Sequence, residues 1–327
     1  MTVKRRSLLG HAAAIAGAAV LPPAARAQAW PDKPITWINP FPAGGGTDVF
    51  ARPLAARLTE ALGQQVLVDN KGGAGGTVGA TQASRMRPDG YTFFVGAIHH
   101  TIAPSIYKKL DYDLEKDFVP ITMIALVPQV VSIHPQRVPV NTLREFIDYA
   151  TANPGKINYA SPGAGTAHHL AGELFQILTR IRLTHVPFRG AGPAMQDLLA
   201  GQVDMMFDGM GTSAQPIRTG RLKGLAVATR ERVKAFPEIP TALELGVAGW
   251  EVSTWYGLWA IKGTPEPVIE RMHIEAIRAL QHPDLVKIWA EQSAQSGGES
   301  RADFARRIRA EIEKWAKVCQ EAGVKLD

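Results

Sequence analysis

Between residues 35 and 95, short apolar runs alternate with segments of helical periodicity. Apolar residues recur at helical spacing from Val49 to Leu62, and Gly63 follows as a helix stop. In order, the pattern predicts a strand over 35–39, a helix over about 49–62, a strand over 65–68, a helix from about 77 to 87 and a strand over 91–95. The sequence therefore predicts a β-α-β-α-β unit with a Gly-rich loop before each helix.

A second copy of this order begins about 120 residues later. Its segments are a strand over 157–160, a Gly-rich loop over 161–166, a helix over 167–179, a strand over 183–186, a helix ending at 199 and a strand over 203–207. No helix is predicted directly after Asp208, which ends the last strand. Two units at this distance indicate two similar α/β lobes rather than a short-period solenoid.

Two long apolar stretches, residues 121–133 and 255–261, lie between and after the units. By analogy with hinged two-lobe binders, we interpret them as two chain crossings. Lobe 1 would then be 28–127 plus 256–327, and lobe 2 would be 128–255. The alternative, two independent domains on a linker, has no Gly/Ser-rich or Pro-rich tract to support it. Alternating strands and helices favour mostly parallel sheets, whose ligand sites lie at the carboxyl ends of the strands.

The net charge of the chain is concentrated at its N-terminus. The 327 residues contain 36 Lys plus Arg against 30 Asp plus Glu, a net charge of +6, and are 46% apolar and 20% charged. Residues 1–27 hold four of the basic residues and no carboxylate, so the remainder has a net charge of only +2. This composition is typical of a folded protein of about two domains and excludes disordered and fibrous classes. After residue 27 there is no basic run of the kind that binds nucleic acid.

The N-terminal segment has the three parts of an export signal. Lys4, Arg5 and Arg6 form a charged region, an Ala/Gly-rich apolar run follows, and Ala25-Arg26-Ala27 ends the segment as a cleavage site. The apolar run is too short and too weakly apolar for a membrane anchor. The arginine pair favours the twin-arginine route, and the Sec route stays open. We expect export and cleavage after about Ala27.

Three Gly-rich loops lead into helices at the carboxyl ends of predicted strands. A helix N-terminus carries unpaired N–H groups and partial positive charge, and therefore stabilises an anion. The three N-termini after Gly46, Gly76 and Gly165 can together hold a carboxylate or a phosphate without Lys or Arg. The alternative is that these loops are only tight strand-to-helix turns.

Four other residues at these strand ends are candidates for the cleft. Phe41 precedes the first Gly-rich loop and can form the floor of a pocket, and His99 follows the strand 91–95. Asp48 lies in a first helical turn, where it either complements the helix dipole or contacts a ligand. Asp208 ends a strand and is an acceptor candidate. The two carboxylates also leave open an exported α/β enzyme that uses acid/base chemistry.

The usual catalytic and cofactor motifs are absent. The glycines of the three loops do not complete G-x-G-x-x-G, and G-x-x-x-x-G-K-[ST] does not occur. Tyr159 stands where a G-x-S-x-G elbow around Ser161 needs Gly. The histidine pairs 99–100 and 168–169 lack the spacing of a metal site. We therefore expect no enzyme activity, no cofactor and no metal.

Six short segments, spread in order over the chain after residue 28, form a specific set. They are 41–48 (FPAGGGTD), 72–76 (GGAGG), 88–92 (PDGYT), 168–175 (HHLAGELF), 185–188 (HVPF) and 201–208 (GQVDMMFD). This set resembles the Bug family, the TctC-like periplasmic solute receptors of tripartite tricarboxylate transporters. The resemblance implies a type II periplasmic binding protein, acting as a monomer, that closes on a small organic carboxylate and delivers it to a TctA/TctB-like membrane permease. A second hypothesis is a receptor that signals through a membrane sensor kinase.

The resemblance also implies a set of binding residues in the loops of both lobes. Carried over by position, the residues that hold a ligand carboxylate are Ala43, Gly44, Gly45, Thr47, Gly76, Thr77, Ser161, Gly165 and Thr166. Asp208 then meets the distal part of the solute. Arg189 stands where many members of the family have Lys, and His99 is the unusual residue of the segment 98–100. Residues 209–213 replace a commoner Asn-Leu-type continuation after Asp208, and selectivity is expected to lie at these positions.

Overall fold

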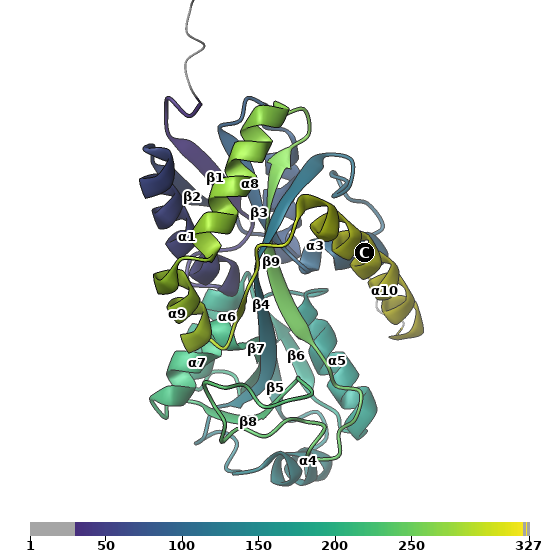
Figure 1. The fold of residues 1–327 in the computed structure, drawn as a ribbon. Helices are drawn as coiled ribbons and strands as arrows, with labels where there is room; N and C mark the ends of the chain where they lie inside the picture. The colour runs from purple at the N-terminus through teal and green to yellow at the C-terminus, as the bar shows by residue number, and fades with distance from the viewer. Residues whose placement is uncertain (1–29, 323–324, 326–327) are drawn as a thin grey trace, which may run out of the picture.

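One curved sheet runs through both halves of the molecule (Figure 1). The computed structural model describes residues 30–322 and 325, so the predicted export signal lies outside the described residues. Within the described part, ten strands follow the order β2-β1-β3-β9-β4-β7-β5-β6, with β8 and β10 also paired to β4. We call the part around β1 to β3 lobe 1 and the part around β5 to β7 lobe 2.

Lobe 1 contains both ends of the described chain. Its strands are β1 (Ile35–Asn39), β2 (Val66–Asn70), β3 (Thr92–Ala97), β9 (Ser253–Ile261), β10 (Gln295–Ser296) and the first part of β4 (Phe118–Ile133). Its helices are α1 (Gly46–Leu62), the 3-10 turn η1 (Ala74–Gly76), α2 (Thr77–Ser84), α3 (His99–Ile106), α8 (Glu266–Leu280), α9 (Pro283–Glu291) and α10 (Arg301–Ala322). The predicted β-α-β-α-β order of this lobe is confirmed, and α3, which contains His99, is an additional helix.

Lobe 2 repeats the arrangement. Its strands are β5 (Asn158–Ser161), β6 (Thr184–Pro187), β7 (Met205–Gly209), β8 (Lys223–Val227) and the last part of β4. Its helices are α4 (Leu143–Ala152), α5 (Ala167–Thr179), α6 (Ala191–Leu199) and α7 (Met210–Arg218). The expectation of no helix after Asp208 is wrong, because α7 begins two residues later. Met210, Ala214 and Ile217 recur at helical spacing in α7, a signal that Pro216 and the polar residues between them obscure.

Two long strands connect the lobes, as the apolar stretches predict. β4 pairs antiparallel with β9 as far as Pro128 opposite Ser253, and with β7 from Gln129 opposite Gly209. The outer strands of each lobe are parallel, since β1 pairs in this way with β2 and β3, and β5 with β6 and β7. The prediction of parallel sheets therefore holds for the outer strands, whereas the crossing strands make the sheet mixed. The exact division of the chain at 127/128 and 255/256 stays a proposal that these pairings support.

The hydrophobic core is continuous across the hinge on one face of the sheet. Phe50 and Leu54 of α1 and Trp289 of α9 lie in the same buried cluster as Met210 and Ala214 of α7. Helices α3 and α10 cover the other face of lobe 1 (Figure 1). None of the helices in the described part is both long and apolar enough to span a membrane.

Candidate functional site

The loops at the carboxyl ends of the strands meet between the lobes, and glycines allow them to approach closely. A Cβ added to Gly192 would lie 2.6 Å from the backbone oxygen of Ala43, and one added to Gly163 would lie 3.5 Å from the Cα of Gly75. Each pair joins lobe 1 to lobe 2. The structure is therefore closed, with backbone against backbone across the cleft.

A small cavity remains behind these contacts. The residues that line it are Phe41, Gly45, Gly46, Thr47, His99, Pro162, His168, Ala191 and Tyr256. The volume that the centre of a water molecule can occupy in it is about 10 Å³, so the cavity has room for about one water. No Lys or Arg is among the lining residues. A solute of several atoms therefore requires the lobes to separate before it can enter.

Two helices from opposite lobes begin at this cavity without a side-chain cap. Gly45 is the N-cap of α1 and Gly190 is the N-cap of α6, and neither has a side chain that could satisfy the first N–H groups. Ala191, the first residue of α6, lies against Gly45, with its nitrogen 3.7 Å from the position of a Gly45 Cβ. Two positive helix ends thus face each other across the cleft.

The N-terminus of α5 is different, because the N–H groups of Gly165, Ala167 and His169 already have partners. The Thr166 hydroxyl accepts the His169 N–H at 3.4 Å, and the Gly165 N–H donates to His169 Nδ1 at 3.1 Å. The Ala167 N–H donates across the cleft to Nδ1 of His99 at 3.1 Å. His99 is therefore a bridge between the lobes, and Nε2 is the nitrogen that carries its proton.

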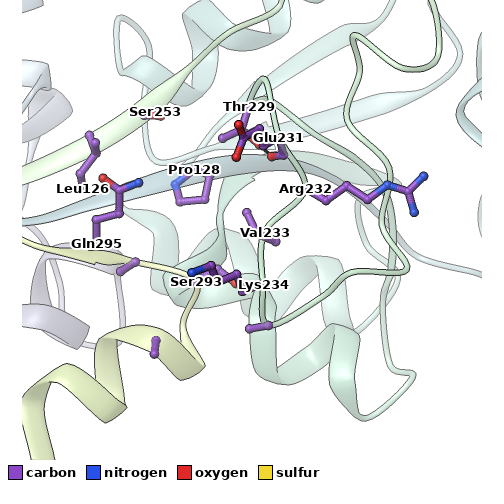
Figure 2. A pocket seen from close by; sticks show the side chains of 13 residues that line it. Leu126, Pro128, Thr229, Glu231, Arg232, Val233, Lys234, Ser253, Ser293 and Gln295 are labelled. Carbon is purple, nitrogen blue, oxygen red and sulfur yellow. Dashed lines mark hydrogen bonds between the residues drawn. The ribbon is translucent and has the colours of Figure 1, made fainter. Parts of the chain in front are cut away.

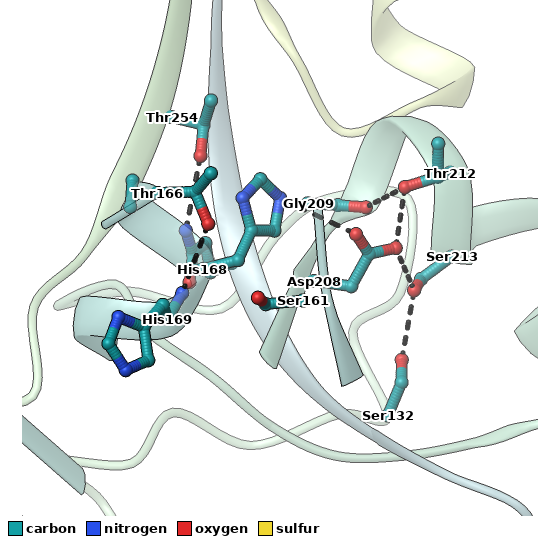
Figure 3. Close-up of polar contacts among 12 residues, drawn as sticks. Ser132, Ser161, Thr166, His168, His169, Asp208, Gly209, Thr212, Ser213 and Thr254 are labelled. Carbon is teal, nitrogen blue, oxygen red and sulfur yellow. Dashed lines mark hydrogen bonds and ion pairs between the residues drawn. The ribbon is translucent and has the colours of Figure 1, made fainter. Parts of the chain in front are cut away.

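His168 and Asp208 form a buried pair next to the cavity (Figure 3). His168 Nε2 lies 3.5 Å from Asp208 Oδ1, and the two side chains are 4% and 0% exposed. The other carboxylate oxygen, Oδ2, accepts hydrogen bonds from Thr212 at 2.5 Å and from Ser213 at 2.7 Å. Neither His168 Nδ1 nor Asp208 Oδ1 has a hydrogen-bond partner. An unpaired acceptor on a buried ring is costly unless something binds to it.

Tyr256 closes the cavity from the crossing strand β9. Its ring stacks on Phe50 with centroids 5.3 Å apart. Its hydroxyl oxygen lies only 2.0 Å from the position that a Gly46 Cβ would occupy. Glycine is thus required at position 46. Burial, and then the charge of Asp208, raise the pKa of Tyr256, so the phenol is neutral.

Five histidines gather around the cleft, and we refer to them as the cleft histidines. They are His99, His100, His168, His169 and His185. Burial lowers the pKa of each of them, to about 4 for His100 and about 3 for His185. All five are neutral at physiological pH.

Ser161 is tied to this histidine group rather than to the cavity. Its hydroxyl lies 2.6 Å from His185 Nε2 and accepts the Gly163 N–H at 3.2 Å. His185 stacks on His169 with ring centroids 4.0 Å apart. The hydroxyl therefore shapes the loop 161–166 and is not free to meet a ligand in this arrangement.

Asp48 supports the first Gly-rich loop from below. Its Oδ2 accepts the Gly44 N–H at 3.1 Å and Arg52 Nε at 2.8 Å, and its Oδ1 accepts Asn70 Nδ2 at 3.0 Å. Burial opposes ionisation, but the hydrogen bonds from Arg52, Gly44 and Asn70 outweigh it and hold the pKa of Asp48 below its ordinary value. With both oxygens occupied, Asp48 fixes the loop that presents the α1 N-terminus.

The predicted site residues fall into two groups. Phe41, Gly45, Thr47 and His99 line the cavity. The others surround it or lie outside it, and they are Ala43, Gly44, Asp48, Gly76, Thr77, Ser161, Gly165, Thr166, Arg189 and Asp208. Thr77 donates to the Ala74 carbonyl, and Arg189 is exposed.

The predicted binding residues do not include five residues of the cavity wall, which are Gly46, Pro162, His168, Ala191 and Tyr256. Gly46 and Pro162 do lie in Gly-rich loops that the sequence identifies. Ala191 begins a helix whose Gly-rich entry, 190–192, could have been recognised as a fourth anion-ready loop. The sequence places His168 in a predicted helix and Tyr256 in an apolar stretch, and it predicts no ligand contact for either. No group of three or more His, Cys, Asp or Glu side chains in the described part is placed to hold a metal ion.

A larger cavity lies elsewhere, beside the crossing strands β4 and β9 (Figure 2). It has a volume of about 470 Å³ and is lined by Leu126 and Pro128 of β4, by the loop 229–235 and by residues 290–295. None of the Gly-rich loops reaches it. We place the candidate site in the smaller cavity, because uncapped helix N-termini from both lobes meet there.

Two α/β lobes, two crossing strands and facing helix N-termini define a two-lobed solute-binding protein. Comparison with known proteins identifies the family. The tripartite tricarboxylate transporter family receptor, TctC, matches residues 50–324. BugT of Bordetella pertussis is 35% identical over 302 residues, which cover 92% of this chain and 92% of BugT. The chain belongs to the TctC family of receptors, as its motifs predict.

Solved structures agree over nearly the whole chain. The periplasmic binding protein BugD superposes with a TM-score of 0.87 at 35% identity, covering 90% of this chain and 99% of BugD. A Rhodopseudomonas palustris protein solved with adipate gives 0.87 at 33% identity, with coverages of 90% and 99%. MatC of the same organism, solved with malate, gives 0.82 at 34%, with coverages of 88% and 99%. The predicted type II periplasmic binding protein fold is confirmed, and the family is one of receptors rather than enzymes.

Proposed function

We propose that this protein captures a small organic carboxylate between its lobes in the periplasm and delivers it to a tripartite tricarboxylate-type permease. The observation that carries the proposal is the meeting of the uncapped N-termini of α1 and α6 at one cavity. The two partial positive charges repel each other when the lobes close, and an anion between them converts this repulsion into attraction. Binding and closure are thereby coupled.

The hydrogen bonds from the two helix ends can supply the binding free energy without a fixed cation. A hydrogen bond to a charged group contributes about 1.5–3 kcal/mol, and each helix end offers two or three N–H groups. Four such bonds would contribute roughly 6–12 kcal/mol before the costs of association, which reach several kcal/mol. Micromolar affinity, about 8 kcal/mol, lies within this range. The adipate and malate in the two related structures are carboxylates, which supports the same class of solute here.

The test introduces a carboxylate into the proposed anion site. Gly45 has φ −83° and ψ 170°, which suits an N-cap side chain, and a Cβ there would make only ordinary contacts at 3.6 Å. Gly45→Asp should cap α1, raise the unfolding free energy by a few tenths of a kcal/mol and abolish carboxylate binding in isothermal titration. Gly45→Ala adds the same first carbon without the charge, so the difference between the two variants measures the anion site. Equal binding by the two variants, or no binding of any carboxylate by the native protein, would refute the proposal.

Export and delivery form a separate part of the proposal. The N-terminal signal sequence and membership of a receptor family support a periplasmic location, with cleavage after about Ala27. N-terminal sequencing of the protein from a periplasmic extract should give Gln28 as the first residue. Deletion of the gene should abolish uptake of the solute identified by titration, whereas a purely signalling receptor would leave uptake intact.

A further inference from the structure

Among the residues that line the cavity, His168 has a fully buried polar atom without a hydrogen-bond partner. Its ring lines the cavity and meets the His99 ring at a centroid distance of 5.5 Å. It is 4% exposed, and its Nδ1 has no partner, while Nε2 faces Asp208 at 3.5 Å. A buried ring nitrogen without a partner is costly, so a solute group that donates a hydrogen bond to it would stabilise the closed form.

The protonation of His168 is fixed from behind. Asp208 accepts two hydroxyl hydrogens at Oδ2, from Thr212 and Ser213, and Ser213 in turn accepts from Ser132 at 3.0 Å (Figure 3). An anionic carboxylate can only accept, so the His168 nitrogen that faces it, Nε2, must carry the proton. Burial lowers the pKa of His168, while the charge of Asp208 raises it, and the balance leaves the ring neutral. Nδ1 is then a bare lone pair.

The lone pair and the carboxylate behind it decide what can bind next to them. A second carboxylate on the solute would face the lone pair of Nδ1, with the negative charge of Asp208 beyond it. A hydroxyl or ammonium group on the solute would instead donate to Nδ1 and satisfy it. The opposite wall contributes the Nε2–H of His99 and the Tyr256 hydroxyl, which can serve the acceptor atoms of the solute.

We propose that His168 selects solutes that carry a hydrogen-bond donor, a hydroxyl or an amino group, beside the carboxylate, and that Asp208 positions His168 for this contact. This inference rests on the proposed function and refines it, because it narrows the solute from any small carboxylate to hydroxy or amino acids. His168 is the specificity-determining residue, and Asp208 acts through it.

Titration with matched pairs of acids tests the selection directly. Lactate against propionate and malate against succinate differ by one hydroxyl, and alanine against propionate differs by one amino group. The donor-bearing member of at least one pair should bind about tenfold more tightly or better. His168→Leu should bring that ratio to about one. His168→Asn, whose amide oxygen can replace Nδ1 as an acceptor, should retain a preference and shows that a loss in the leucine variant is not a folding defect.

The Asp208→Asn variant provides a measurement that would not change if Asp208 had only a structural role. Thr212 and Ser213 hold one oxygen, so the new amide N–H₂ takes the place of Oδ1 and donates to His168 Nε2. The proton then moves to Nδ1, and the preference should change toward the acid without the donor. Long-range ¹H–¹⁵N NMR spectra should show His168 protonated at Nε2 in the native protein and at Nδ1 in the variant.

The outcomes separate this inference from the proposed function. If no carboxylate binds, the receptor proposal fails. If carboxylates bind, but the hydroxyl pairs bind equally and His168→Leu leaves their ratio unchanged, then a water occupies Nδ1 and the selection by His168 is refuted.

Discussion

Gly192→Ala should separate closure of the lobes from folding. Gly192 is the second residue of α6, and its backbone needs no positive φ. Its added Cβ would lie 2.6 Å from the Ala43 oxygen, a backbone atom of lobe 1, whereas ordinary contacts begin at about 3.4 Å. The loop that contains Ala43 would have to retreat by the difference, about 0.8 Å. Closure brings these two loops together, so the strain exists only in the closed form.

The expected magnitude follows from this difference between the two forms. An extra methyl group in a packed contact costs about 1–3 kcal/mol, which here destabilises the closed form alone. In the open form, alanine instead adds up to about 1 kcal/mol of helix stability. Because affinity scales with the fraction of the binding-competent form, the dissociation constant should rise by about 5- to 150-fold. In the absence of solute, the urea concentration at the midpoint of unfolding should be unchanged or slightly higher.

Isothermal titration with the best carboxylate measures the first effect, and urea unfolding measures the second. Gly209→Ala is the matched control, because its Cβ would meet only the Val127 side chain, at 3.6 Å. Small-angle scattering with saturating solute should show incomplete compaction for the Gly192 variant. Native affinity in Gly192→Ala would show that the loops do not need to meet in the bound form, and would refute the reasoning.

Three further changes test the supports of the site. Asp48→Asn removes a carboxylate that accepts from Arg52 and from the Gly44 N–H, so the free energy of unfolding in urea should fall by about 2–3 kcal/mol. Arg52→Gln removes only the first of these bonds and should lower it by about 1 kcal/mol. Equal losses in the two variants would contradict the role of the Gly44–Asp48 hydrogen bond. Because the pKa of Asp48 is lowered in the folded state, its contribution is present above about pH 4 and is lost as the pH falls further. The cleft histidines also have lowered pKa values in the folded state, so the unfolded chain binds more protons below about pH 6.5. The unfolding temperature should therefore decrease as the pH falls from about 7.5 to 5, because each histidine can lower the free energy of unfolding by up to about 1.4 kcal/mol per pH unit. An unfolding temperature that is independent of pH in this range would contradict the neutrality of the cleft histidines. Thr166→Val removes the cap of α5, which should cost about 1 kcal/mol of stability in urea, while Thr166→Ser should retain most of it.

Local signals in the sequence were sufficient for most elements and for the position of the loops. Helical and strand periodicities predicted the two α/β units, and Gly63 does end α1, with φ 68° and its N–H bonded to the Thr59 oxygen. The short sequence motifs were enough to identify the family. These features depend on residues a few positions apart, which a sequence records directly.

The state of the donors at each helix end could not be predicted in this way. The α5 N-terminus was expected to be open, but His99, 68 residues earlier, accepts the Ala167 N–H. The sequence predicts no anion site at the α6 N-terminus, which lines the cavity. Both outcomes depend on how the lobes meet. Asp48 is an intermediate case, because its bond to the Gly44 N–H is local and its bond to Asn70 is not.

The buried cluster shared by α1 and α7 has a consequence for how the chain unfolds. A Cβ at Gly211 would lie 2.6 Å from the Phe50 ring, so these helices are in direct contact at the hinge while the loops at the cleft separate. Neither lobe can lose its structure without exposing apolar surface of the other. Amide hydrogen exchange in β4 should therefore report a single opening event for the whole molecule, and a solute bound at the cleft should slow exchange in both lobes equally.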